Sequence, residues 1–436
     1  MITTNYTAAP NNISATASGN TVLQAANTAK TKFNFDLEAL RAVAAIIVVL
    51  SHVVNTVNTL DPAYHPGGIW AYAAPGHLSV LLFFILSGYV IGKAHAVPLQ
   101  RDTILLYLKK RFVRIYPIYS ICILFVLLVL VKSPSLAIIL SHLFLTQGLT
   151  TPVLHDIAPS WSLTYEIVFY LLFIPISYFR ANPVFMAIAM VMLGTIAAYF
   201  FPGFAKGLLP TYAFGFTFWL CGLILARYSR PDESTVSYAS MVGIILLFLT
   251  LGVLDSPPAL LHRVQLFLLR KDLTIVPAGQ DAYLAFRDFA FLPYCAVMVA
   301  IFAGIKLKFR KALIAFMTLL PALSLVHYMK AEDGHPPVAL LFTALFYALS
   351  IVFFLFPARL EQFSKRIIKG LVPLGSISYG LYIVHFPLLC LILSFSAFSG
   401  SGLTYCVRLA VFLLLTFSAA YFLEKVYQPR VRKAIG

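Results

Sequence analysis

The chain has 436 residues, of which 60% are hydrophobic and only 11% are charged, and its mean hydropathy is +0.88. Because soluble domains carry about 25% charged residues, this composition excludes a soluble protein. It predicts an all-α, polytopic transmembrane helical bundle. The 32 Lys and Arg residues outnumber 16 Asp and Glu, but they lie between apolar runs, so we expect membrane lipid and no nucleic acid as a partner.

The chain starts with a polar segment and continues into closely spaced apolar runs. Residues 1–32 are rich in Ala, Thr, Asn and Ser and predict a disordered cytoplasmic tail rather than a signal peptide. We expect a membrane domain at 33–429 and a basic C-terminal tail at 430–436. A spanning helix needs about 20 apolar residues, so 136–147 is too short. About ten to twelve spans are expected, with candidates at 37–57, 78–95, 115–132, 161–179, 183–201, 210–227, 237–254, 288–305, 312–329, 338–356, 372–394 and 403–424.

Basic residues lie in five clusters between these candidates, all on one side of the membrane. The positive-inside rule makes that side cytoplasmic, which predicts cytoplasmic termini. The long segment 255–287 is placed outside although it also carries basic residues. The clusters are Arg101, Lys109, Lys110, Arg111 and Arg114; Arg227 and Arg230; Lys306, Lys308, Arg310 and Lys311; Arg359, Lys365, Arg366 and Lys369; and Arg430, Arg432 and Lys433.

The first candidate helix carries two polar residues at opposite ends of an apolar run. Arg41 and His52 are eleven positions apart, which is about three helical turns, so they share a face at a separation of roughly 16 Å. Arg41 either snorkels to headgroups or faces the bundle interior. His52 either bonds to a backbone carbonyl near the outer surface or acts as a general base.

Three later segments add candidate site residues. Arg111 and Arg114 share a helix face and form either a phosphate-binding pair or a membrane anchor. Glu166 lies in an apolar helix, where a buried carboxylate requires an Arg, a His or a hydroxyl as partner. His385 follows an apolar run that also carries Tyr382, and alone it is typical of a structural histidine. Five isolated cysteines show no metal-ligand spacing, so no metal is expected.

Taken together, these segments resemble the acyltransferase-3 family of integral membrane acyltransferases, from about Phe35 to Pro429. The first helix is similar to the family's Arg-x10-His pattern. The closing Glu-x-Pro pattern is altered, because Pro429 follows Glu424 by five positions. Many members continue into a hydrolase-like SGNH domain, and this chain is expected to be a stand-alone form. The matching residues are Asp36, Arg41 and His52; Phe83, Phe84, Ser87, Gly88 and Tyr89; Arg111, Arg114, Ile115 and Pro117; Trp161, Ser162, Leu163, Glu166, Phe169 and Tyr170; and Ser378, Tyr379, Tyr382, His385 and Pro387.

The resemblance implies transfer of an acyl group, most often acetyl, from cytoplasmic acyl-CoA to a hydroxyl of a carbohydrate or lipid-linked glycan. Arg41, with His52 among the expected catalytic residues, would lie at the cytoplasmic mouth and bind the donor together with Arg111 and Arg114. His52 would activate the acceptor or carry the acyl group itself. Glu166 would orient His52 or pair with an arginine.

Supporting roles fall to Ser162, Tyr382 and His385. A glycan or small-solute transporter is the alternative, although the two halves of the chain show no repeat. The acceptor, the acyl group and the oligomeric state cannot be read from the sequence.

Overall fold

The structure is a computed structural model that describes residues 35–67, 72–230, 237–274, 283–330 and 340–435. Within these ranges the chain is helical and contains no β-strand, which confirms the all-α prediction. The tail predicted at 1–32 lies outside the described residues.

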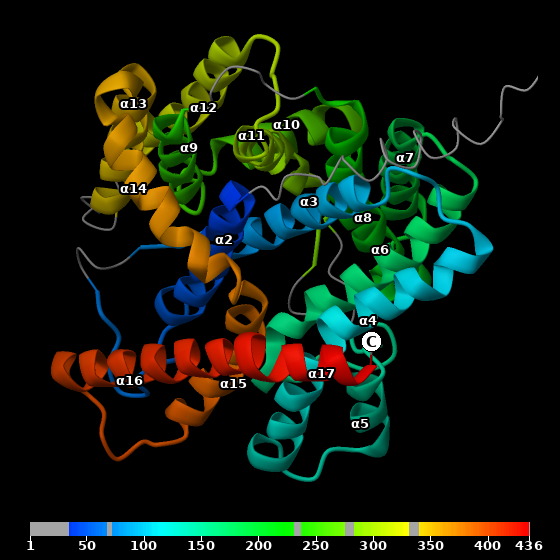
Figure 1. Ribbon diagram of the computed structural model, residues 1–436. Coiled ribbons are helices and arrows are strands. Elements are labelled where there is room, and N and C mark those ends of the chain that lie inside the picture. Colours follow the sequence, from blue (N-terminus) through cyan, green and yellow to red (C-terminus); the bar gives the residue numbers. More distant parts are fainter. Residues whose placement is uncertain (1–34, 68–71, 231–236, 275–282, 331–339, 436) are drawn as a thin grey trace, which may run out of the picture. The chain divides into compact units, whose positions relative to one another are not determined.

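Helices follow one another along the described chain, joined by connections of very different length (Figure 1). Their bounds are α2 Phe35–Val54, α3 Gly76–Ala94, α4 Arg101–Phe125, α5 Leu136–Leu143, α6 Trp161–Tyr178, α7 Pro183–Phe200, α8 Leu208–Tyr228, α9 Tyr238–Thr250, α10 Ser256–Leu269, α11 Leu292–Phe302, α12 Arg310–Lys330, α13 Leu341–Leu355, α14 Pro357–Gly375, α15 Ser378–Leu393, α16 Gly402–Tyr421 and α17 Gln428–Ile435.

In the described part of the chain, eight helices are long and apolar enough to cross a membrane. A ninth span results if α13 and α14, which meet at a bend of 117°, are taken together. Three of the twelve candidate runs instead form the shorter helices α9, α11 and α15, of 13, 11 and 16 residues. At about 1.5 Å per residue none of these reaches the roughly 30 Å of a bilayer core.

The chain's last long helix extends through the segment expected as a basic tail. It runs without a break over Gly402–Ile435, 34 residues, so that residues 430–435 are helical. A π-helical segment, Phe422–Tyr427, interrupts its α-helical pattern. Such segments add a residue to the turn, change the direction of the side chains that follow and are frequent at functional sites. This one contains Glu424.

Helices α3 and α8 pack with their backbones in close contact because each contributes a glycine. A Cβ atom at Gly88 would lie 1.9 Å from the carbonyl oxygen of Trp219, and one at Gly222 would lie 2.0 Å from that of Ile85. Only glycine allows this approach. The pair holds α3, which forms one wall of the site described below, against the rest of the bundle.

A buried polar cluster joins the loop after α2 to α16. Asp61 is fully buried and accepts hydrogen bonds from Thr404 Oγ1 at 2.7 Å and from the Gly400 amide at 3.0 Å. Burial alone would raise the pKa of Asp61, but these bonds, the Ala63 amide and the nearby charge of Arg408 lower it on balance. The carboxylate is therefore charged at neutral pH and fixes the loop that follows His52.

We expect Gly88→Ala to destabilise the protein by about 2–3 kcal/mol or more, because the added methyl group meets backbone atoms that cannot move independently. Gly370→Ala is the matched control, since a Cβ there meets nothing within 4 Å and alanine favours the helix by roughly 0.5–1 kcal/mol. Thermal unfolding of both variants in detergent tests this. Equal melting temperatures would show that α3 and α8 tolerate separation.

Candidate active site

A cavity with about 860 Å³ of space, including the part open to solvent, lies between α2, α3, α4, α6 and α15. It brings together residues that are up to 341 positions apart in the sequence. Six of the eight residues predicted for the site line this cavity, and the other two, His52 and His385, do not. The six are Arg41, Arg111, Arg114, Ser162, Glu166 and Tyr382.

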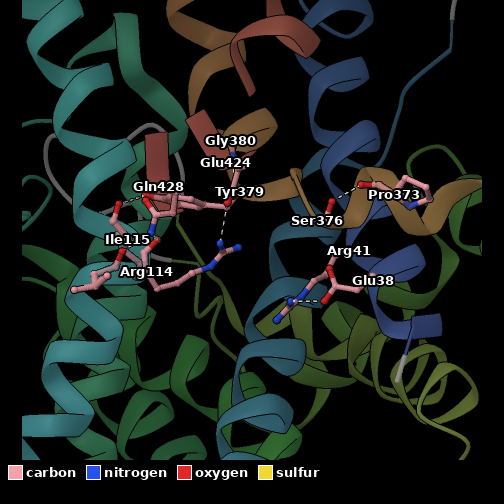
Figure 2. Close-up of polar contacts among 11 residues, drawn as sticks. Glu38, Arg41, Arg114, Ile115, Pro373, Ser376, Tyr379, Gly380, Glu424 and Gln428 are labelled. Atoms are coloured by element: carbon pink, nitrogen blue, oxygen red, sulfur yellow. Dashed lines mark hydrogen bonds and ion pairs between the residues drawn. The ribbon is translucent and has the colours of Figure 1, made fainter. Parts of the chain in front are cut away.

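Arg41 faces the protein interior rather than lipid. Its guanidinium pairs with Glu38 on the preceding turn of α2, with Nη1 and Oε1 2.8 Å apart, as Figure 2 shows. The Arg41 side chain is 27% exposed and this exposed part belongs to the cavity wall. The interior alternative for Arg41 is therefore the one the structure favours over snorkelling.

Arg114 is held by a residue near the end of the chain. Its Nη1 lies 2.9 Å from Glu424 Oε2, and that carboxylate is 3% exposed. The other oxygen, Oε1, accepts the Gly380 amide at 3.2 Å. The guanidinium also lies 5.6 Å from the centre of the Tyr379 ring. Figure 2 shows these groups meeting where α4, α15 and the C-terminal helix come together.

Arg111 is placed by aromatic rings and keeps hydrogen-bonding capacity. Its guanidinium carbon lies 5.7 Å from the Tyr107 ring centre and 5.8 Å from that of Tyr170, distances at which cation–π attraction operates. Its Nε is buried and makes no hydrogen bond with any described residue. A buried donor without a partner is costly, so a bound anion would satisfy it.

Glu166 is hydrogen-bonded to hydroxyl groups, one of the three kinds of partner expected for a buried carboxylate. Its Oε1 accepts hydrogen bonds from Ser87 Oγ at 2.9 Å and from the Tyr170 hydroxyl. Neither of these hydrogen bonds involves His52 or an arginine, so the more specific expectation, that Glu166 orients His52 or pairs with an arginine, stays a prediction. Glu166 instead orders the cavity wall next to Arg111, because Tyr170 contacts both residues.

His52 and His385 form a pair although 333 residues separate them. His52 Nδ1 lies 3.1 Å from His385 Nε2, and the ring centres are 5.1 Å apart. His52 is partly buried, whereas His385 is fully buried. The ring centres of His52 and Phe386 lie 4.9 Å apart in an edge-to-face arrangement. The backbone carbonyl expected as one alternative for His52 is also present, since Nδ1 lies 3.0 Å from Val48 O.

The hydrogen bonds of this pair assign the tautomers. His385 Nδ1 lies 3.0 Å from Leu381 O, and a carbonyl can only accept, so this nitrogen carries the proton. In the neutral ring Nε2 of His385 is then an acceptor. His52 Nδ1 must donate, because both its neighbours, Val48 O and His385 Nε2, accept. The remaining lone pair is on His52 Nε2, as a general base requires.

Tyr382 connects the histidine pair to the cavity. Its hydroxyl lies 2.7 Å from Ser162 Oγ and donates to Pro159 O at 2.9 Å. Tyr382 lines the cavity, and its ring centre is 6.4 Å from that of His385. The cavity wall that contains Ser162 and Tyr382 therefore separates the arginine-containing space from the two histidines.

Two features escaped the sequence reasoning. One is the role of Glu424, for which the sequence analysis gives only the altered spacing to Pro429. A lone carboxylate in an apolar run is the signal that could have indicated a buried ion pair there. His155, Asp156 and Cys390 each present one ligand atom, all within 4.8 Å of one another. They could hold a metal ion. Because Cys390 is far from His155 and Asp156 in the sequence, the three residues form no recognisable metal-ligand motif.

The Arg114–Glu424 pair should couple two helices energetically. Because Arg114 is 36% exposed, solvent screening reduces the interaction, and we expect about 1–2 kcal/mol from a double-mutant cycle of Arg114→Gln and Glu424→Gln. Glu424→Gln retains an acceptor for Gly380. Unfolding of the four proteins in detergent measures the coupling, and effects that simply add would show that the pair contributes nothing.

Comparisons with known proteins identify the family of this chain. A family model described as an acyltransferase domain, of the acyltransferase-3 type, matches residues 34–329, which include His52 and Glu166 but end before Tyr382. A protein of Rhizobium radiobacter described as "Protein 2 in picA locus" is 33% identical over 145 residues, 32% of this chain and 63% of its own length. The chain thus covers less than two thirds of that relative. No solved structure matches. Since the family model covers more than half of the chain, this protein belongs to the acyltransferase-3 family of membrane acyltransferases.

Proposed function

We propose that this protein is an O-acyltransferase of the bacterial inner membrane that moves an acyl group, most simply acetyl, from cytoplasmic acyl-CoA to a hydroxyl of a carbohydrate or lipid-linked glycan. One observation carries the proposal. A single cavity is lined by three arginines and bounded by Tyr382. The Tyr382 ring contacts His385, which is hydrogen-bonded to His52. The Nε2 atom of His52 keeps a free lone pair and can act as a base. Both termini, and the arginine end of the cavity, are cytoplasmic in this proposal.

The arginines of the cavity are complementary in charge to the proposed donor. Acyl-CoA is anionic through its phosphates, and guanidinium groups bind phosphate in bidentate geometry. Arg111 has a buried Nε without a partner in the described residues, and Arg41 and Arg114 each reach the cavity beside it. The thioester end of the donor would extend along the cavity toward Tyr382.

His52 would act on the acceptor. Its Nε2 removes the proton of the acceptor hydroxyl, the oxygen attacks the thioester carbonyl, and the carbon–sulfur bond breaks. The CoA thiolate leaves and receives the proton from His52. During the reaction His52 is an imidazolium, and its Nδ1–H donates to His385 Nε2, 3.1 Å away, which disperses the charge.

A second route uses the same residues. His52 Nε2 attacks the thioester itself, releases CoA and then passes the acyl group to the acceptor. Incubation with radiolabelled acetyl-CoA and no acceptor distinguishes the routes. Label retained by the wild-type protein and lost in His52→Ala supports the acyl-histidine, and an unlabelled protein supports direct transfer.

His52→Ala should lower acyl transfer by about 10²–10⁴-fold, the usual contribution of a general base, while the protein stays abundant in the membrane. The assay measures label from acetyl-CoA in membrane glycan. His327→Ala, on the exposed part of α12, is the matched control. Undiminished transfer by His52→Ala removes this residue from the mechanism, and a wild-type protein that never labels any glycan favours the transporter alternative.

His385→Ala should lower kcat about 10–100-fold and leave the KM for acetyl-CoA unchanged, because His385 contacts His52 and not the cavity. His385→Gln, which can restore an acceptor oxygen toward His52 Nδ1, should recover part of the rate. A rise in KM with constant kcat would instead assign His385 to donor binding, and equal loss in both variants would leave it a packing residue.

A further inference from the structure

A second cavity lies beside the first, and its polar lining is entirely cationic. It has about 1010 Å³ of space, including the part open to solvent, and no acidic residue lines it. Five of its seven lining residues are basic: Lys109, Lys110, Arg111, Arg114 and Arg432. So many like charges repel one another unless an anion lies among them.

The C-terminal helix closes this cavity in a defined orientation. The Gln428 side-chain amide donates to the carbonyl of Val113, which fixes the start of α17 against α4. Arg432 follows Gln428 by four residues and so lies on the same helix face, where it lines the cavity. Arg430, two residues after Gln428, points away from that face and is exposed.

Most of the positive charge in the cavity is not neutralised by the protein. Arg114 pairs with Glu424. Lys109, Lys110, Arg111 and Arg432 have no ion-pair partner among the residues that the structure describes. Arg111 in addition has the buried, unsatisfied Nε. The cavity therefore offers about four unmatched cations.

The two cavities share part of their walls. Arg111 and Arg114 line both of them, so a ligand in the cationic cavity lies beside the cavity bounded by Tyr382. A long donor with a charged end and an uncharged reactive end matches this arrangement.

We propose that Lys109, Lys110 and Arg432 form the subsite for the clustered phosphates at the nucleotide end of the acyl donor, with Arg111 at the junction. This inference rests on the proposed function. A nucleotide with a diphosphate and a phosphomonoester carries about four negative charges, which equals the unmatched positive charge. The C-terminal helix is then part of the donor site and not only a membrane anchor.

The test compares two donors that differ only in the nucleotide. Arg432→Ala and the double variant Lys109→Ala/Lys110→Ala should each raise the KM for acetyl-CoA about tenfold or more, since each removes charge-assisted hydrogen bonds to phosphate. The KM for S-acetyl-pantetheine, which lacks the nucleotide, should not change. Arg430→Ala, on the same helix with the same charge, should affect neither donor. An unchanged preference for acetyl-CoA in Arg432→Ala overturns the subsite, although transfer itself still occurs.

A binding measurement separates the nucleotide from a lipid headgroup, which offers similar phosphate chemistry. Adenosine 3′,5′-bisphosphate should bind the purified wild-type protein in detergent and bind Arg432→Ala at least about tenfold more weakly. The same result in nanodiscs of neutral lipid and of phosphatidylglycerol supports a nucleotide subsite. Loss of binding only when phosphatidylglycerol is present assigns the cavity to anionic lipid and overturns the proposal. Because no turnover is involved, this result stands even if the proposed reaction fails.

Discussion

A charge inside an apolar bundle must be matched by another group, and this requirement decides which helices meet at the site. Arg114 and Glu424 are 310 residues apart and still lie 2.9 Å from each other. The same carboxylate accepts the Gly380 amide, so three helices from distant parts of the chain are joined at one point. The π-helical segment that contains Glu424 changes the direction of its side chain within an otherwise regular helix. The pair thus adds the C-terminal helix to a contact that α4 and α15 already make, since the Tyr379 hydroxyl donates to the Ile115 carbonyl at 2.9 Å.

The parts of the site that follow from helical geometry could be predicted from the sequence. Arg41 and His52 lie on one helix, and a fixed period determines their common face. Motif order then placed Arg111, Arg114, Ser162, Glu166 and Tyr382 in one functional group, and the cavity contains all five.

Pairing between distant segments could not be predicted in the same way. Nothing in the local pattern around His52 specifies that its partner is His385, or that Glu166 bonds to Ser87 and Tyr170. Such partners depend on how the helices pack.

The lengths of the shorter helices could not be predicted from the sequence either. Hydropathy measures the composition of a window and does not show where a helix ends, so α9 and α11 were expected as full spans. The segment 357–371 was expected as a basic connection and lies in helix α14, which is bent by 117° from α13. The bend lets Gly375 lie against α2, where a Cβ would come within 2.0 Å of the Glu38 carbonyl oxygen. That contact places the end of α14 beside the Arg41–Glu38 pair.

In the proposed reaction, Tyr382 and Ser162 would determine what passes between the arginine-lined cavity and the histidine pair. The Tyr382 hydroxyl bonds to Ser162 Oγ and to Pro159 O, and breaking these buried bonds costs on the order of 1–3 kcal/mol. Binding of a donor arm can supply this amount, whereas an empty cavity cannot. In direct transfer the thioester itself has to move past Tyr382 to meet the hydroxyl that His52 activates. In the acyl-histidine route only the acyl group crosses, and CoA stays on the arginine side. The two routes therefore differ in how far Tyr382 must move, and the hydrogen-bonded, closed position found here is compatible with a resting state of either one.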